Sequence, residues 1–277
     1  MKPAFQKDEA FLEDLAAARA AGRSRLWWLG QSGFLLASPQ GTILFDPYLS
    51  DSLTKKYAAT DKPHIRMTEQ VIAPERLTGI DFITSSHNHT DHLDADTLLP
   101  LLSANPNAKL VIPRANRELV LERLGEVKER LEEIDTGESL TVGGMEFHGI
   151  PAAHNTVERD ENGCCRFLGF VVRLAGKTCY HSGDTLLHDG LVAALMPFQP
   201  DVAMVPINGN RPERRVAGNL DGREAAWLAH TIGAGIAIPH HFDQFEFNTA
   251  LPDEFEEACR GLGQAFRTLK NGEALDL

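Results

Sequence analysis

A short histidine-rich segment most constrains how this chain can fold. Three imidazoles and one carboxylate fall within six consecutive positions, at His87, His89, Asp91 and His92. Four such groups cannot be buried in an apolar core without partners that satisfy them. Histidine is the commonest neutral nitrogen ligand of transition metals, and a nearby carboxylate adds a charged oxygen. The spacing therefore favours a metal site over a solvated polar turn.

The sequence on either side places this segment between a strand and a helix. Residues 80–85 form an apolar, β-branched run that is typical of a buried strand. From Asp94 to Leu102 the apolar residues are spaced as in a helix, with Asp94 as a candidate N-cap. Open α/β sheets carry their chemistry at the carboxyl ends of strands. We therefore expect the side chains of this loop to converge on one or two ions.

Further candidate ligands follow three other strand-like runs. Residues 146–150 lead to His154, residues 177–181 lead to Asp184, and residues 236–239 lead to a pair of histidines at 240 and 241. Each run is followed by a small residue or proline before the histidine or aspartate. This repeated order predicts a rim of loops above a sheet, with enough donors for a catalytic site that needs about three protein ligands per ion.

These motifs resemble the metallo-β-lactamase superfamily over nearly the whole chain, from about residue 25 onward. The resemblance rests on His-x-His-x-Asp-His, a later isolated histidine, Ser-Gly-Asp and Ile-Pro-x-His. Residues 27–30, 180–184 and 238–241 are also similar to the L-ascorbate-6-phosphate lactonase-like branch. The resemblance implies an α/β (α+β) fold in which two sheets are covered by helices, a four-layer αββα sandwich, and the predicted alternation of strands and helices agrees with it.

The resemblance also implies how the ligands are shared between ions. Carried over position by position, it implies one ion held by His87, His89 and His154, a second held by Asp91, His92 and His241, and Asp184 bridging the two. His241 is assigned because it occupies the last position of the Ile-Pro-x-His motif, and its neighbour His240 remains an alternative.

Further residues are candidates for orienting a ligand or contacting substrate: Asp46, His181, Asn208, Asn210 and Arg211. Asp46 precedes a proline at the end of a predicted strand, where a carboxylate either orients a ligand imidazole or simply forms a turn. The guanidinium groups of the loop 208–215 suit a phosphate or carboxylate on a small substrate, although solvated surface arginines are the favoured alternative. A histidine hydrogen-bonded in the interior is the favoured interpretation of His181.

Two loops have simpler interpretations. The segment Gly30–Gly33 matches no complete phosphate-binding motif, so a hairpin turn is expected there. Residues 155–166, which follow His154, are polar and form either a lid or a plain surface loop.

Composition favours one domain that spans residues 1–277 and includes an N-terminal helix over about 8–22. With 43% hydrophobic and 24% charged residues the chain has enough apolar material for a large core. It has neither a run of 18 apolar residues nor a signal-peptide pattern, so a cytoplasmic protein without a membrane partner is expected. The four cysteines lack CxxC spacing and are expected to be structural. A homo-oligomer is compatible with the sequence.

The pattern of apolar residues predicts most of the strands and helices. Strands are expected at 25–29, 33–38, 42–45, 81–85, 109–112, 131–134, 145–150, 168–174, 177–181, 201–207 and 235–239, and helices at 94–103, 115–124, 186–195, 221–232 and 253–262. A short strand is expected at the end of the chain.

The function expected from these features is that of a metal-dependent hydrolase. One or two divalent ions would make hydroxide available near neutral pH, and Asp91 would both bind metal and orient this nucleophile. Five histidines and two carboxylates favour zinc, while manganese or iron also suits a site without thiolate ligands. A net charge of −12 disfavours a nucleic acid, because a nuclease needs a basic channel.

Three functions are kept open. The first is hydrolysis of a small anionic ester or lactone, for which a sugar-phosphate lactone is one candidate substrate. The second is a phosphodiesterase that acts on a nucleotide or a phospholipid head group. The third is a non-catalytic, metal-dependent binding protein, which is disfavoured because every ligand position is filled.

Overall fold

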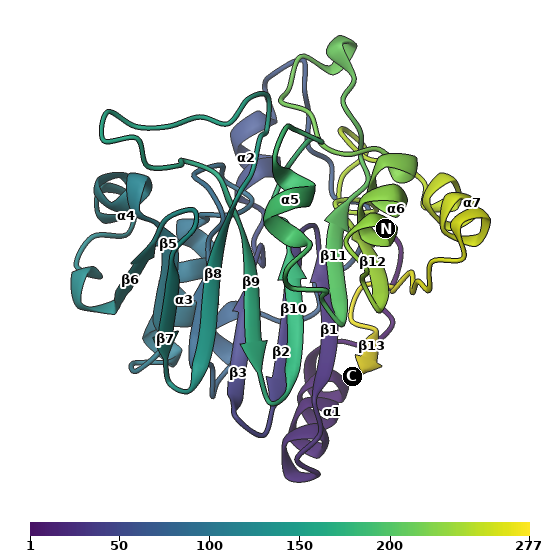
Figure 1. Cartoon of the computed structure of the whole chain (residues 1–277). Helices are drawn as coiled ribbons and strands as arrows, with labels where there is room; N and C mark the ends of the chain where they lie inside the picture. Colours follow the sequence, from purple (N-terminus) through teal and green to yellow (C-terminus); the bar gives the residue numbers. More distant parts are fainter.

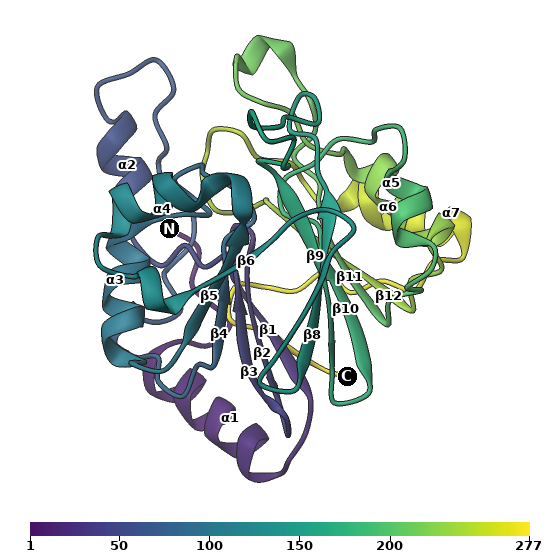
Figure 2. The ribbon, with the colours of Figure 1, turned by 60° about the vertical axis from the view of Figure 1, so that its left-hand side comes forward.

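Two β-sheets pack face to face, and helices cover both outer faces (Figures 1 and 2). A computed structural model describes all 277 residues. Figure 2 looks along the gap between the sheets, with the helices of the first half of the chain on one side and those of the second half on the other. This arrangement confirms the predicted α/β class and its helix–sheet–sheet–helix layers.

The first sheet has seven strands and the second has six, and helices or loops connect them. In spatial order the first contains β13 (Ala274–Asp276), β1 (Arg25–Gly30), β2 (Gly33–Ser38), β3 (Gly41–Phe45), β4 (Phe82–Thr84), β5 (Lys109–Pro113) and β6 (Leu131–Ile134). The second contains β12 (Ile236–His240), β11 (Val202–Pro206), β10 (Lys177–His181), β9 (Leu168–Leu174), β8 (Met145–Pro151) and β7 (Ser139–Val142). The helices are α1 (Asp8–Ala20), α2 (Ser52–Tyr57), α3 (Ala95–Ala104), α4 (Arg117–Leu124), α5 (Leu191–Leu195), α6 (Gly222–Thr231) and α7 (Asp253–Leu262).

Neighbouring tryptophans in β1 show why this strand is buried on both faces. Successive side chains in a strand point to opposite faces. Trp27 therefore packs into the cluster beneath α1, α3 and α4, where the Phe11 ring meets it edge-on at 6.1 Å. Trp28 packs into the core between the sheets, where its ring stacks on Phe242 at 4.6 Å. The double Trp thus joins two hydrophobic cores.

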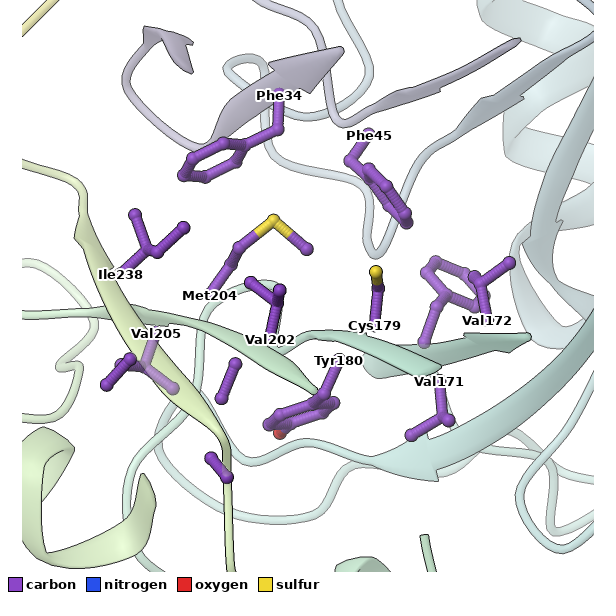
Figure 3. Packing of buried hydrophobic residues seen from close by; sticks show 14 of the residues in the cluster. Phe34, Phe45, Val171, Val172, Cys179, Tyr180, Val202, Met204, Val205 and Ile238 are labelled. Carbon is purple, nitrogen blue, oxygen red and sulfur yellow. The ribbon is translucent and has the colours of Figure 1, made fainter. Parts of the chain in front are cut away.

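The core between the sheets is filled by alternate side chains of both. In Figure 3, Phe34 and Phe45 of the first sheet lie opposite Met204 and Cys179 of the second. Tyr180, next to Cys179 in the chain, lies on the other face of the second sheet. All four cysteines of the chain are free thiols.

Strand direction brings the predicted ligand loops to one end of the sandwich. In the second sheet β10, β11 and β12 are parallel, and β9 is antiparallel to both β8 and β10. The carboxyl ends of β8, β10 and β12 therefore meet at one edge. The loop after β4 of the first sheet joins them there, because the Leu168 N–H donates to the Ser86 carbonyl at 3.0 Å.

The structure corrects three details of the predicted elements. The predicted helix 186–195 is formed only over Leu191–Leu195, since the Leu186 N–H bonds to the Ala153 carbonyl at 2.7 Å instead of starting a helix. The short helix α2 and the edge strand β7 were not predicted, because neither has a long apolar repeat. None of the helices combines the length and the apolar character that crossing a bilayer requires.

Candidate metal centre

A fully buried carboxylate, that of Asp46, organises the loop that follows β4. It accepts hydrogen bonds from the Thr84 Oγ1 at 2.7 Å and from the Ser86 N–H at 3.1 Å, and the Ser86 hydroxyl also donates to it. The same carboxylate lies 2.7 Å from the Nδ1 of His92. Asp46 adopts a positive φ of 37°, a costly conformation that the surrounding bonds hold in place.

Each of three imidazoles has one nitrogen held by the protein. Besides the contact of His92 with Asp46, the Nδ1 of His154 donates to the Gly218 carbonyl at 2.7 Å, and the Nδ1 of His87 lies 3.0 Å from the Ser86 hydroxyl. The Nε2 atoms of His87 and His92 are buried without any hydrogen-bond partner. Because native proteins rarely leave buried polar atoms unpaired, these nitrogens point to an additional partner in the site.

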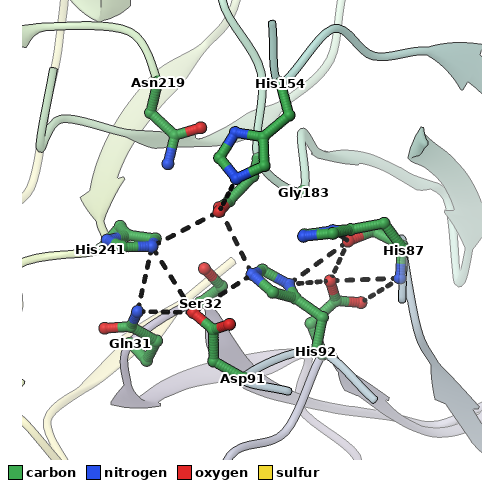
Figure 4. A network of polar contacts seen from close by, with 12 residues as sticks. Gln31, Ser32, His87, Asp91, His92, His154, Gly183, Asn219 and His241 are labelled. Atoms are coloured by element: carbon green, nitrogen blue, oxygen red, sulfur yellow. Dashed lines mark hydrogen bonds and ion pairs between the residues drawn. The ribbon is translucent and has the colours of Figure 1, made fainter. Parts of the chain in front are cut away.

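The seven predicted ligands lie in two adjacent groups at the meeting point of the strand ends. Figure 4 shows five of them, His87, Asp91, His92, His154 and His241. One group is His87, His89 and His154, and the other is Asp91, His92, Asp184 and His241, with the donor atoms of each group within 4.8 Å of one another. The Asp184 carboxylate touches both groups. Its Oδ1 lies 3.4 Å from the Nε2 of His92, and its Oδ2 lies 3.4 Å from the Nε2 atoms of both His154 and His241.

This donor set fits divalent cations. Imidazole nitrogens and carboxylate oxygens are the ligands that zinc, iron and manganese accept. The Oδ1 of Asp184 has no hydrogen bond, as is true of the two Nε2 atoms named above. Two carboxylates held within such a histidine cluster also supply the negative charge that cations require.

The electrostatics of the two groups differ. Burial lowers the pKa of His89 to about 4 and lowers that of His87 well below its usual value, so both imidazoles are neutral at pH 7. Burial would also lower the pKa of His92 and of His241, but the Asp184 carboxylate outweighs it, raising the first well above its usual value and the second to about 9. In the absence of cations, protons on His92 and His241 therefore compensate the carboxylates of the second group.

Burial alone would raise the pKa of the Asp184 carboxyl. The charges of His241 and His92 outweigh it and hold this pKa well below its usual value. The pKa of the Asp91 carboxyl is also well below its usual value, because the charge of His92 outweighs the effect of burial. Both carboxylates are therefore ionised throughout the physiological pH range.

His241, and not its neighbour His240, faces the cluster. The His241 main-chain N–H donates to the Gln31 carbonyl at 3.0 Å, and its positive φ of 61° marks a sharp turn away from β12. His240 stays in the strand and stacks on His181, with ring centroids 5.2 Å apart and planes 4° apart. The Nε2 of His181 donates to the Ser32 carbonyl at 2.7 Å, as expected of an interior histidine.

The predicted substrate contacts in the loop after β11 do not reach the cluster. Asn208 is buried and donates to the Oδ1 of Asn248 at 3.0 Å. Asn210 and Arg211 are exposed and line none of the cavity above the ligands. From the same predicted loop, the turn at Pro212–Arg214 carries Arg215 to the cavity.

A cavity of about 610 Å³ opens directly above the two ligand groups. Besides Arg215, the cavity is lined by several residues that sequence reasoning missed: Gln31, Lys56, Tyr57, Lys62, His64, Phe245 and Phe247. Gln31 belongs to the tight turn between β1 and β2, which was predicted, but its Nε2 also donates to the Oδ2 of Asp91 at 2.8 Å. The only sequence feature that could have indicated this cavity lining is the pair Lys56 and Tyr57, which lies among other polar residues.

The family follows from comparison with known proteins. Residues 41–242 match the model of the β-lactamase superfamily domain. The chain belongs to the metallo-β-lactamase superfamily. It is 30% identical over 265 residues to a UPF0173 metal-dependent hydrolase of Rubrobacter xylanophilus, covering 92% of this chain and 97% of that protein. A second UPF0173 metal-dependent hydrolase, from Alkaliphilus metalliredigens, is 31% identical over 85% of this chain and 93% of its own length.

Solved structures agree on the fold. A metallo hydrolase of Ignicoccus hospitalis superposes with a TM-score of 0.67 at 21% identity, covering 92% of this chain and 98% of that one. CmlA, a diiron β-hydroxylase of Streptomyces venezuelae, superposes with a TM-score of 0.70 at 16% identity, covering 96% of this chain and 59% of CmlA. As a member of the superfamily with metal-dependent hydrolases as relatives, this protein is a metal-dependent hydrolase.

Proposed function

We propose that this hydrolase uses two divalent ions to cleave a small anionic ester or lactone. The observation that carries the proposal is the position of Asp184, whose carboxylate touches both ligand groups on the floor of a single cavity. Four cationic side chains, Lys56, Lys62, Arg123 and Arg215, line the same cavity in a protein of net charge −12, against one carboxylate outside the ligand groups, that of Glu158. This local positive charge is the support for an anionic substrate.

In this proposal His87, His89 and His154 would hold one ion, Asp91, His92 and His241 would hold the other, and the Asp184 carboxylate would serve both. Bound divalent ions supply Lewis acidity, which makes water acidic enough to deprotonate near neutral pH and polarises the bond to be cleaved. The donor set suits zinc best, and it also accepts manganese or iron.

The chain's own residues keep the site in position. Asp91 would act as both ligand and orienting carboxylate for the attacking water, with its Oδ2 held by the amide of Gln31 at 2.8 Å. Gln31 is itself fixed, because its carbonyl accepts hydrogen bonds from the indole of Trp28 at 3.0 Å and from the His241 main chain. Rigid support of this kind is what a catalytic carboxylate needs.

The narrower proposal of a sugar-phosphate lactone rests on the resemblance to the ascorbate-phosphate lactonase-like branch alone. The side chains that carry it include Trp27, Trp28, Tyr180 and His240, all of which are buried in the cores and line none of the cavity. These residues support a shared packing of the sandwich more strongly than a shared substrate. The general class of anionic esters and lactones is therefore preferred.

A substrate screen tests the proposed function. Protein loaded with zinc, and separately with manganese, is offered a panel of lactones and of bis-p-nitrophenyl phosphate. We expect turnover of anionic lactones or esters to exceed that of the diester. A preference for the phosphodiester would identify a phosphodiesterase, and binding without turnover on any ester would identify a binding protein.

Asp46 offers a prediction about ligand orientation. Replacing Asp46 with asparagine removes the carboxylate that holds the Nδ1 of His92, and we expect kcat/KM or metal affinity to fall by about 10–100-fold. The exposed Asp51, which pairs with Arg66, provides the control, and Asp51→Asn should retain both properties. Unchanged activity and metal content in Asp46→Asn would show that Asp46 only stabilises the loop.

The pKa differences predict that the two ligand groups bind cations at different pH values. His87 and His89 are neutral at pH 7, whereas His92 and His241 carry protons that must leave before a cation can bind. The affinity of the second group for a divalent cation should therefore rise as pH increases toward 9. Cation binding should release about two protons per chain. Zinc titration at pH 6 and pH 8.5 should give one tight site and two tight sites, respectively. Equal stoichiometry and affinity at both pH values would contradict this assignment.

A further inference from the structure

The cavity above the ligand groups has an aromatic side that the hydrolytic reaction itself does not require. We define the aromatic wall as Tyr57, His64, Phe245 and Phe247, all of which line the cavity. His64 lies at its centre, with ring centroids 4.5 Å from Tyr57, 5.1 Å from Phe245 and 5.4 Å from Phe247. These rings come from two segments far apart in sequence, the end of α2 with the loop after it and the loop after β12.

The aromatic wall is anchored at several points. The Nδ1–H of His64 donates to the Lys62 carbonyl at 2.8 Å, and the ring of Phe245 packs edge-on against Tyr48 at 5.8 Å. Phe245, Tyr48 and Leu53 form a small hydrophobic cluster of their own, against which Tyr57 packs. A fixed set of aromatic faces beside a cavity favours a flat apolar group, which gains both buried area and stacking.

Basic side chains line another part of the same cavity. We define this cationic rim as Lys56, Lys62 and Arg215. The Nζ of Lys56 donates to the Thr90 hydroxyl at 2.9 Å, and the Nζ of Lys62 donates to the Arg215 carbonyl at 2.5 Å. Neither lysine forms an ion pair, whereas Arg215 pairs with Asp61. Two ammonium groups without carboxylate partners at the edge of the cavity are free to bind an anion.

We infer that the substrate carries both features, a flat apolar group of the size of an aryl ring and an anionic group, carboxylate or phosphate. The aromatic wall takes the ring, and the cationic rim takes the anion. A cavity of about 610 Å³ has room for such a molecule. This inference rests on the proposed ester or lactone hydrolysis for its reaction, but the two recognition surfaces are independent of which bond is cleaved.

A set of four lactones tests the inference on the zinc-loaded protein. Dihydrocoumarin and δ-valerolactone provide an aryl and an aliphatic ring, and a carboxyl derivative of each adds the charge. We expect the carboxylated aryl lactone to have the highest kcat/KM, with the ring and the charge each contributing about tenfold. Phosphorylated counterparts of the two charged lactones show which anion is preferred. A ranking indifferent to both features would overturn the inference.

Variants assign each preference to its surface. Lys56→Met combined with Lys62→Met should remove the preference for charge, mainly through KM, while keeping the preference for the aryl ring. Phe247→Ala should remove the preference for the aryl ring while keeping the preference for charge. The milder Phe247→Leu replaces it if the alanine variant folds poorly. Lys55→Met is the matched control, because Lys55 neighbours Lys56 but faces Asp96 outside the cavity. The exposed Phe5 gives the corresponding control Phe5→Ala.

Calorimetry separates failure of this inference from failure of the proposed function. If none of the lactones is hydrolysed, the proposed function is wrong for this class of bond. Binding of the same four compounds to the zinc-loaded protein then tests recognition alone. Preferential binding of the carboxylated aryl compound, lost in the Lys and Phe247 variants, would support the inference, and equal binding of all four would refute it.

Discussion

Replacing Asp184 with alanine is expected to remove most of the activity and at least one of the two ions. The carboxylate contacts His92, His154 and His241, so it is the one side chain shared by both ligand groups. Loss of a bridging ligand removes several kcal/mol of stabilisation of developing charge. A loss of about 4 kcal/mol corresponds to a decrease of roughly a thousandfold in kcat/KM.

The measurement combines metal analysis with steady-state kinetics on the purified variant. Asp189→Asn is the control, because Asp189 lies on the same loop five positions later and its side chain is exposed. We expect this control to keep both ions and full activity. Full metal content together with full activity in Asp184→Ala would refute the bridging role.

Removing the metal should lower the thermal stability of the whole sandwich. Without cations the floor of the cavity holds buried carboxylate oxygens and histidine nitrogens that lack a hydrogen bond, among them Asp184 Oδ1 and the Nε2 atoms of His87 and His92. A cation present at about a thousand times its Kd stabilises a folded protein by about 4 kcal/mol. For a chain of this size that corresponds to a decrease of about 10 °C in Tm upon chelation.

Calorimetric or spectroscopic melting before and after treatment with a chelator checks this expectation. Returning zinc to the chelated protein should restore the original Tm. The Asp184→Ala protein should respond less to the chelator, since it has less metal to lose. An identical Tm with and without metal would mean that no ion links the strand-end loops.

The convergence of the candidate ligand loops could be predicted from the sequence because the residues that define each loop are local. His87, His89, Asp91 and His92 lie on one loop, and the runs before His154 and Asp184 could each be recognised as strands. Parallel strands then bring such loops to a common edge. The choice of His241 over His240 depended on the resemblance, and the structure gives its physical reason in the turn at the end of β12.

The walls of the cavity could not be predicted in this way. Lys62 and Arg215 meet at the edge of the cavity from segments 153 positions apart, and no local pattern predicts such a contact. The helix α2 is too short to show a helical period, so its Tyr57 could not be assigned to the site. Gln31 lies in a turn that was correctly predicted, but a turn pattern does not reveal where its side chain points.

Crystallography of the metal-loaded protein, with anomalous diffraction recorded at the metal's absorption edge, tests the central claim most directly. The account predicts two peaks, one among His87, His89 and His154 and one among Asp91, His92 and His241, with the Asp184 carboxylate between them. The absence of both peaks, or His154 and His241 turned away from the loop after β4, would contradict it.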